Sequence, residues 1–227
     1  MKFKFIGNAG GIFTGSKGTK ILCDPWIVDG VFESAWYHYP PLKTKLSDIQ
    51  NVDGIYVSHI HPDHYDERHF DFPKDIPLII LNEGPNFLKK NLINKGYSNF
   101  IEIKNDQTVQ FKEFKLTLYK PFTKHIFEES LIANLIDSAL VLENDDVTAI
   151  NFNDNQPDEN ACSFLKNKFK NIDLAMLNYN AAGPYPSCFD NLSTEEKINE
   201  NINKFNNLEY YILVCLYKLK PLPTLAV

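Results

Sequence analysis

Short runs of apolar or alternating apolar and polar residues recur along the chain, and most are closed by Gly, Pro, Asn, Asp or a polar turn. Runs of this length between turn residues are typical of β-strands. The pattern predicts strands over residues 3–6, 11–14, 20–23, 54–57, 78–81, 100–103, 108–111, 114–119, 138–143, 147–152 and 174–177.

Three longer stretches have helical character instead, over residues 85–95, 159–171 and 194–206. In the first, Leu88 and Leu92 are four residues apart and share one face of a helix, as core-facing residues do. The first half of the chain is therefore rich in strands, and the later part alternates strand and helix. This order predicts sheets packed on each other with helices outside, an α/β fold of the αβ/βα sandwich type.

The composition fits one folded domain and excludes some partners. A chain of 227 residues with 44% hydrophobic residues can bury a large core, so we expect a single domain over residues 1–227. The formal net charge is −6 and the pI is about 5.5. Because Lys and Arg are everywhere mixed with Asp and Glu, no basic stripe is available, and we expect no nucleic-acid partner.

The sequence shows no pattern typical of a secreted, membrane-spanning or disulfide-linked protein. The opening residues 1–7 alternate polar and apolar, as a strand does, and have no apolar core of a secretory signal. No segment is long and apolar enough to predict a membrane span. The four cysteines, Cys23, Cys162, Cys188 and Cys215, are scattered and form no C-x-x-C pair. We therefore expect a reducing, cytoplasmic location, and a homo-oligomer is compatible with the sequence.

Three histidines and an aspartate lie within six residues in the run Ser58-His59-Ile60-His61-Pro62-Asp63-His64, directly after the strand predicted over residues 54–57. Imidazoles and carboxylates are preferred ligands of zinc and of neighbouring first-row metals. Side chains two residues apart in an extended loop share a face, so His59 and His61 are predicted to point the same way. Asp63 and His64 follow as the chain turns after Pro62, which supplies a second pair of ligands.

The run resembles the H-x-H-x-D-H signature of the metallo-β-lactamase superfamily, and the similarity extends over about residues 1–190. Gly7-Asn8-Ala9-Gly10, Asp24-Pro25-Trp26, the aromatic stretch 35–41 and Gly183-Pro184-Tyr185-Pro186 are similar to the branch with the lactamase-like domain of CMP-N-acetylneuraminate hydroxylases. Ascorbate-6-phosphate lactonase and N-acylphosphatidylethanolamine phospholipase D are more distant relatives in that branch. The resemblance implies a four-layer αβ/βα sandwich that binds one or two Zn²⁺ ions, with Mn²⁺ or Fe²⁺ as alternatives.

It also implies metal ligands beyond the signature. His125, in a loop after the strand predicted over residues 114–119, is the candidate that completes the first site; a plain loop histidine is the alternative. Asp154 follows the strand predicted over residues 147–152 and is placed to bridge two metals, although an Asn/Asp-rich turn would look similar. Asp137 is a weaker acidic candidate, in a supporting or solvated position.

The C-terminal part departs from the superfamily. Many members supply a last histidine near the C-terminus, and this chain has none after His125. Residues 206–227 do not resemble the expected closing strand and helix, so we expect an atypical or truncated end. The second metal position then has at most Asp63, His64 and Asp154 as ligands.

These observations predict a metal-dependent hydrolase in which metal-bound water attacks the substrate and Asp63 orients that water or takes its proton. The branch resemblance implies a phosphorylated or nucleotide-linked sugar metabolite, or a similar ester or lactone, as the small-molecule substrate. A Rieske cluster of the hydroxylase type is not expected, because no cysteine has a histidine two residues away. The alternative is a catalytically impaired binding or assembly module with an incomplete metal site.

Aromatic residues in predicted loops are the candidates for substrate binding. Trp26, Trp36 and Tyr185, together with Tyr37 and Tyr39, are suited to line a pocket for a sugar or a base. Partly buried anchors of the loops are the alternative role for the same side chains.

Overall fold

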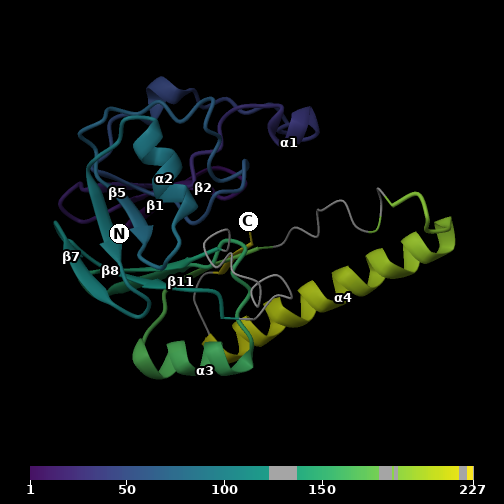
Figure 1. Ribbon diagram of the computed structural model, residues 1–227. Coiled ribbons are helices and arrows are strands. Elements are labelled where there is room, and N and C mark those ends of the chain that lie inside the picture. The colour runs from purple at the N-terminus through teal and green to yellow at the C-terminus, as the bar shows by residue number, and fades with distance from the viewer. Residues whose placement is uncertain (123–136, 179–185, 187–188, 220–223, 227) are drawn as a thin grey trace.

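The computed structural model describes residues 1–122, 137–178, 186, 189–219 and 224–226, and two six-stranded sheets dominate it (Figure 1). The first sheet has the order β1 (Lys2–Gly7), β2 (Gly10–Thr14), β3 (Lys20–Cys23), β4 (Gly54–Tyr56), β5 (Leu78–Leu81) and β6 (Phe100–Ile103). The second has the order β12 (Thr224–Ala226), β11 (Leu174–Leu177), β10 (Val147–Asn151), β9 (Ala139–Asn144), β8 (Phe114–Tyr119) and β7 (Thr108–Phe111).

Each sheet combines antiparallel and parallel pairs. In the first, β1 to β3 are antiparallel and β3 to β6 are parallel; in the second, β7 to β10 are antiparallel, and β10, β11 and β12 are parallel. The strands that lie inside the sheets are buried nearly throughout, as the continuous apolar run Leu78–Leu81 illustrates. All eleven strand regions predicted from the sequence are confirmed to within about one residue at each end.

The core is divided into three apolar layers. Between the two sheets, Phe13 and Tyr56 of the first pack with Phe114 and Leu140 of the second. Leu88 and Leu92 of α2 (Phe87–Asn94) pack on the outer face of the first sheet, and α3 (Glu159–Lys168) and α4 (Thr194–Leu219) cover the outer face of the second (Figure 1). This is the predicted αβ/βα sandwich of four layers.

The helices start where short polar side chains can cap them. The Asn86 side chain accepts a hydrogen bond from the Lys89 N–H and begins α2, and the Asp158 side chain accepts one from the Ala161 N–H and begins α3. Two short elements, α1 (Val31–Ser34) and the 3₁₀ turn η1 (Leu46–Asp48), have too few residues for a periodic signal and are absent from the sequence prediction.

The C-terminal part differs from the prediction in the length of its helix and in a closing strand. The third helix does not end at residue 206 but runs to Leu219, and β12 then pairs in parallel with β11. Cys215 and Leu219 near its C-terminal end are buried against the second sheet, whereas Ile198, Ile202 and Phe205, in its N-terminal half, are exposed. The N-terminal part of α4 extends past the sheet (Figure 1). The predicted helix over residues 159–171 also ends earlier, at Lys168. Among the described helices, none is both long and apolar enough to cross a membrane.

Candidate metal centre

The histidine-rich run begins one residue after β4, and a residue that follows the neighbouring strand fixes its first backbone N–H. The backbone N–H of Ser58 donates to Asp24 Oδ1 at 2.8 Å, and Asp24 directly follows β3, which is parallel to β4. After Pro62 the chain makes one helical turn, in which the N–H groups of His64 and Tyr65 both donate to the His61 carbonyl. The turn directs Asp63 and His64 back toward the strand end, as expected from the spacing.

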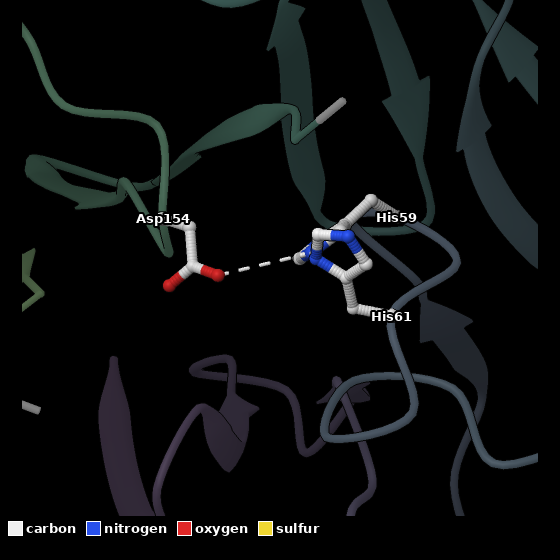
Figure 2. A group of neighbouring side chains, drawn as sticks. All are labelled: His59, His61 and Asp154. Carbon is white, nitrogen blue, oxygen red and sulfur yellow. Dashed lines mark hydrogen bonds and ion pairs between the residues drawn. The ribbon is translucent and has the colours of Figure 1, made fainter. Parts of the chain in front are cut away.

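His59 and His61 point toward one another from the same face of the loop (Figure 2). Nε2 of His59 lies 2.7 Å from Nδ1 of His61 and 3.7 Å from Asp154 Oδ2. Asp154 reaches them from the turn after β10 of the second sheet. The three residues thus offer two nitrogen atoms and one oxygen atom that lie within 4.8 Å of one another.

A second group shares the same aspartate. Nε2 of His64 lies 3.4 Å from Asp154 Oδ2 and 3.6 Å from Asp63 Oδ2. Asp63, His64 and Asp154 again present donor atoms within 4.8 Å of one another. Asp154 therefore stands between two sets of candidate ligands, one formed with His59 and His61 and the other with Asp63 and His64.

The side of each buried imidazole that faces away from this centre contacts oxygen atoms. The Ser58 hydroxyl lies 2.9 Å from Nδ1 of His59 and 3.3 Å from Nδ1 of His64. Asp137 Oδ1 lies 3.3 Å from Nδ1 of His59, and Asp24 Oδ2 lies 3.2 Å from Nδ1 of His64. Contacts of this kind fix the orientation of both rings and leave each Nε2 directed at the shared centre.

Three supporting residues were not assigned a role from the sequence. Asn178, at the end of β11, donates from Nδ2 to Asp154 Oδ1 at 2.7 Å, which leaves Oδ2 facing the histidines. Ser58 and Asp24 contact the imidazoles from behind. Asp24 and Asn178 directly follow the ends of β3 and β11, and Ser58 lies one residue further from the end of β4. A polar residue just after a strand was therefore the signal by which the sequence could have indicated these three residues. Asp137 takes the supporting position considered for it.

The charges of the centre are strongly coupled. Burial, together with the imidazoles of His64 and His61, lowers the pKa of His59 well below its ordinary value. Burial disfavours the charged form of His64 as well, but the carboxylates of Asp154 and Asp24 raise its pKa well above the ordinary value. Burial also raises the pKa of Asp63. The pKa values of these two adjacent imidazoles are thus shifted in opposite directions, because neighbouring imidazoles add to the effect of burial at His59, whereas the carboxylates outweigh it at His64.

The arrangement fits divalent cations. Two donors bound at about 2.1 Å to one tetrahedral zinc ion lie about 3.4 Å apart. The distances from Asp154 Oδ2 to His59 and His64 are near that value, at 3.7 and 3.4 Å, whereas His59 and His61 would need to separate by several tenths of an ångström. Asp63 Oδ1 is buried and has no hydrogen-bond partner in the described part of the chain. Nitrogen and oxygen donors in this combination suit zinc and its first-row neighbours.

A small cavity of about 50 Å³ opens onto these ligands. Its lining includes Trp26 and Trp36 beside Asp63, His64 and Asp154. Trp26 is also a buried anchor, 4% exposed, whose indole N–H donates to the Val28 carbonyl. Both roles considered for the tryptophans are therefore compatible with their positions. His125 and Tyr185, the other predicted site residues, lie outside the described residues.

The chain has the metallo-β-lactamase fold. It superposes on a possible metal-dependent hydrolase from Veillonella parvula with a TM-score of 0.70 and 18% identity, over 99% of this chain and 84% of that one. The metallo-beta-lactamase fold protein YhfI from Bacillus subtilis gives a TM-score of 0.52 and 14% identity, over 96% and 88% of the two chains. CmlA, a diiron beta-hydroxylase from Streptomyces venezuelae, gives 0.64 and 13%, over 96% and 43%. No family model matches the sequence.

Sequence relatives support the same resemblance. A protein of Mycolicibacterium smegmatis named as a Rieske 2Fe-2S iron-sulfur protein is 30% identical over 84% of this chain and 36% of its own length. Yeast N-acyl-phosphatidylethanolamine-hydrolyzing phospholipase D is 29% identical over 44% of this chain and 22% of its own. Cytidine monophosphate-N-acetylneuraminic acid hydroxylase of Asterias rubens is 29% identical over 38% and 15%. The chain thus spans about a third, or less, of these curated relatives.

Proposed function

We propose that this chain is a metal-dependent hydrolase whose water-activating centre comprises His59, His61, Asp63, His64 and Asp154. The observation that carries the proposal is the pair of three-residue groups that share Asp154. Two adjacent cation positions with a common carboxylate suit hydrolysis, because both the attacking and the leaving oxygen need stabilisation. The metal-dependent hydrolase of similar fold from Veillonella parvula supports the same reaction class.

Zinc, one or two ions, is the proposed cofactor, and when bound it supplies Lewis acidity and lowers the pKa of a ligated water toward neutrality. The residues of the chain position the water, the metal ligands and the substrate. Asp63 orients the attacking water and accepts its proton at a carboxylate oxygen. Asn178 holds Asp154 by its Oδ1. Trp26 and Trp36 restrict the volume beside His64 and keep bulk water from the reacting group.

The proposed substrate is a phosphorylated or nucleotide-linked sugar, or a similar ester or lactone. The curated relatives include one protein named for a phospholipid and one named for a nucleotide-linked sugar acid, and both substrates contain a phosphodiester. The cavity at the centre, about 50 Å³, is too small for a whole substrate of this kind, so most of the substrate would lie outside it. We also propose a cytoplasmic location, compatible with the free thiols of Cys23, Cys162 and Cys215.

The decisive experiment combines metal analysis with a generic substrate. Protein purified without chelator is analysed for bound metals and then assayed with bis-p-nitrophenyl phosphate after loading with zinc, manganese or iron. We expect one or two tightly bound ions per chain and metal-dependent release of nitrophenol. A protein that binds no metal and releases no nitrophenol would instead be a catalytically impaired binding module.

A further inference from the structure

The side chain of Asn153 is buried and has no hydrogen-bond partner among the residues that the structure describes. The residue lies in the turn between β10 and Asp154 and is 3% exposed. Neither Oδ1 nor Nδ2 of its amide is hydrogen-bonded within the part of the chain that the structure describes, although its backbone N–H donates to Asn151 Oδ1. Buried amides in native proteins are almost always paired, because an unpaired donor or acceptor loses its hydrogen bonds to water.

Asn153 lines the cavity at the metal centre. The cavity of about 50 Å³ contacts Asn153 together with Asp63, His64 and Asp154. The backbone of Asn153 is left-handed, with φ of 51°, a conformation that is costly for most side chains and most readily adopted by Gly, Asn and Asp. A left-handed backbone conformation, a buried amide without a partner in the described part of the chain, and candidate metal ligands therefore coincide at one turn, as is common where a ligand binds.

The chemistry of the amide selects its ligand. Oδ1 only accepts hydrogen bonds and Nδ2 only donates them, so a group that pairs both atoms must present a donor beside an acceptor. An ionised phosphate or carboxylate offers acceptors alone and would leave Oδ1 unpaired. A second amide offers both an N–H and a carbonyl oxygen, and its planar group is small enough for the cavity.

We propose that Asn153 is a specificity-determining residue that binds an amide group of the substrate, such as an N-acyl substituent, next to the reacting bond. This inference rests on the proposed function, because it assumes that the substrate enters at the metal centre. It narrows the substrates proposed above to those that have an amide within a few bonds of the ester or phosphoryl group.

The test compares two probes of the same shape on the zinc-loaded chain. N-methylacetamide has the N–H and the carbonyl, whereas butanone has a methylene in place of the N–H. Binding is followed in NMR spectra of isotope-labelled protein through the backbone signals of residues around the cavity, which every variant retains, and in the wild type also through the side-chain amide signals of Asn153, identified by their absence in Asn153→Gly. We expect N-methylacetamide to shift these signals and to bind about tenfold more tightly than butanone, as one added hydrogen bond predicts.

Two glycine variants provide the matched comparison. Glycine accepts a left-handed backbone, so Asn153→Gly removes the amide without adding strain. Asn8→Gly is the control, because Asn8 also has positive φ, at 48°, and lines the same cavity but is exposed. The preference for N-methylacetamide should disappear in Asn153→Gly and persist in Asn8→Gly. Equal binding of both probes to the wild type, no binding of either, or a preference retained in Asn153→Gly would overturn the proposal.

The two proposals fail separately. Metal content and turnover of bis-p-nitrophenyl phosphate decide whether the chain is a metal-dependent hydrolase, and neither measurement involves an amide ligand. A wild-type chain that binds zinc and cleaves the phosphodiester, but does not distinguish the two probes, would leave the hydrolase in place and remove only the role of Asn153.

Discussion

The two ends of the β-sandwich handle carboxylates in opposite ways. At one end, the turn between β2 and β3 meets the turn between β7 and β8, where Glu113 accepts hydrogen bonds from the backbone N–H groups of Lys17 and Thr19 and from the Ser16 hydroxyl. The buried Asn144 adds contacts with Ser16 and Glu113. The carboxylate of Glu113 is thus hydrogen-bonded at both oxygen atoms, and these bonds connect the two sheets. We call this the joined end.

At the other end, the metal-site end, the carboxyl ends of β3, β4, β10 and β11 bring charged groups together. Some of the polar atoms in the described residues there have no hydrogen-bond partner. Asp63 Oδ1 and both polar atoms of the Asn153 amide are buried and have no hydrogen-bond partner in the described part of the chain. Hydrogen bonds within the protein would have been the more stabilising arrangement. Hydrogen bonds between the two sheets are thus complete at the joined end, whereas the described residues of the metal-site end retain unpaired polar atoms that suit a ligand from outside.

The largest expected effect is that of His61→Ala at the metal-site end. The variant removes one of two nitrogen donors from the first group, so we expect turnover of bis-p-nitrophenyl phosphate to fall more than about 100-fold, beyond the 10–100-fold typical of outer partners. Because His61 is exposed and outside the apolar layers, the far-ultraviolet circular dichroism should be unchanged.

His69→Ala is the matched control for this variant. His69 lies in the same segment, is exposed and contacts Asp66 rather than the centre. It should retain both metal and activity. Equal losses in the two variants would mean that the segment as a whole, and not a ligand, had been disturbed.

A smaller effect is expected from Asn178→Ala. The substitution frees Asp154 to rotate because its Oδ1 loses the donor at 2.7 Å, and outer partners of this kind typically contribute about 10–100-fold to metal affinity. Zinc affinity is measured by competition with a chromogenic chelator, and the unfolding midpoint in urea is recorded without metal. We expect weaker zinc binding with little change in the midpoint.

Asn144→Ala, at the joined end, should give the reverse result. Asn144 is buried, and its Oδ1 accepts a hydrogen bond from the Ser16 N–H at 3.0 Å. Its loss is expected to lower the free energy of unfolding by about 1–3 kcal/mol, while zinc affinity stays the same. If Asn178→Ala and Asn144→Ala both weakened zinc binding, the two ends would be coupled. The distinction between a stabilising end and a metal-binding end would then be wrong.

Local patterns were sufficient to predict most of the fold. The strands were recognisable because apolar runs such as 78–81 are short and bounded by turn residues, and the clustering of three histidines after 54–57 located the metal-site end. The extent of α4 was missed because residues after 206 no longer present a single apolar stripe, and β12 was missed because its three residues follow a run rich in proline.

Contacts between segments that are distant in the sequence could not be predicted from local patterns. Asn178 and Asp154 are 24 residues apart, and Ser58 and Asp24 are 34 apart, so no local pattern relates them. Only the parallel arrangement of their strands brings them together at one edge. Asn153 gave no signal either, since one asparagine among several in the run 151–155 looks like an ordinary turn.

The smallest expected effect concerns acid stability at the joined end. Burial opposes ionisation of Glu113, but hydrogen bonds from Lys17, Thr19 and Ser16 lower its pKa to about 2, from 4.5. A carboxylate whose pKa is lower in the folded than in the unfolded protein contributes stability above pH 4.5, and this contribution is lost as the pH falls toward 2. Glu113→Gln removes the charge, so the metal-free variant should unfold at a lower temperature than the wild type at pH 7.

The pH dependence of that difference isolates the contribution of Glu113. The gap in melting temperature between wild type and Glu113→Gln should be constant from pH 7 to about pH 5 and should narrow below pH 4.5, where the unfolded wild type begins to take up the proton. Asp71→Asn is the control, since Asp71 is an exposed carboxylate whose ion pair with Lys74 spans 3.9 Å, and exposed pairs contribute little. A gap that stayed constant down to pH 3 would show that the geometry of the turn, and not the charge of Glu113, joins the two sheets.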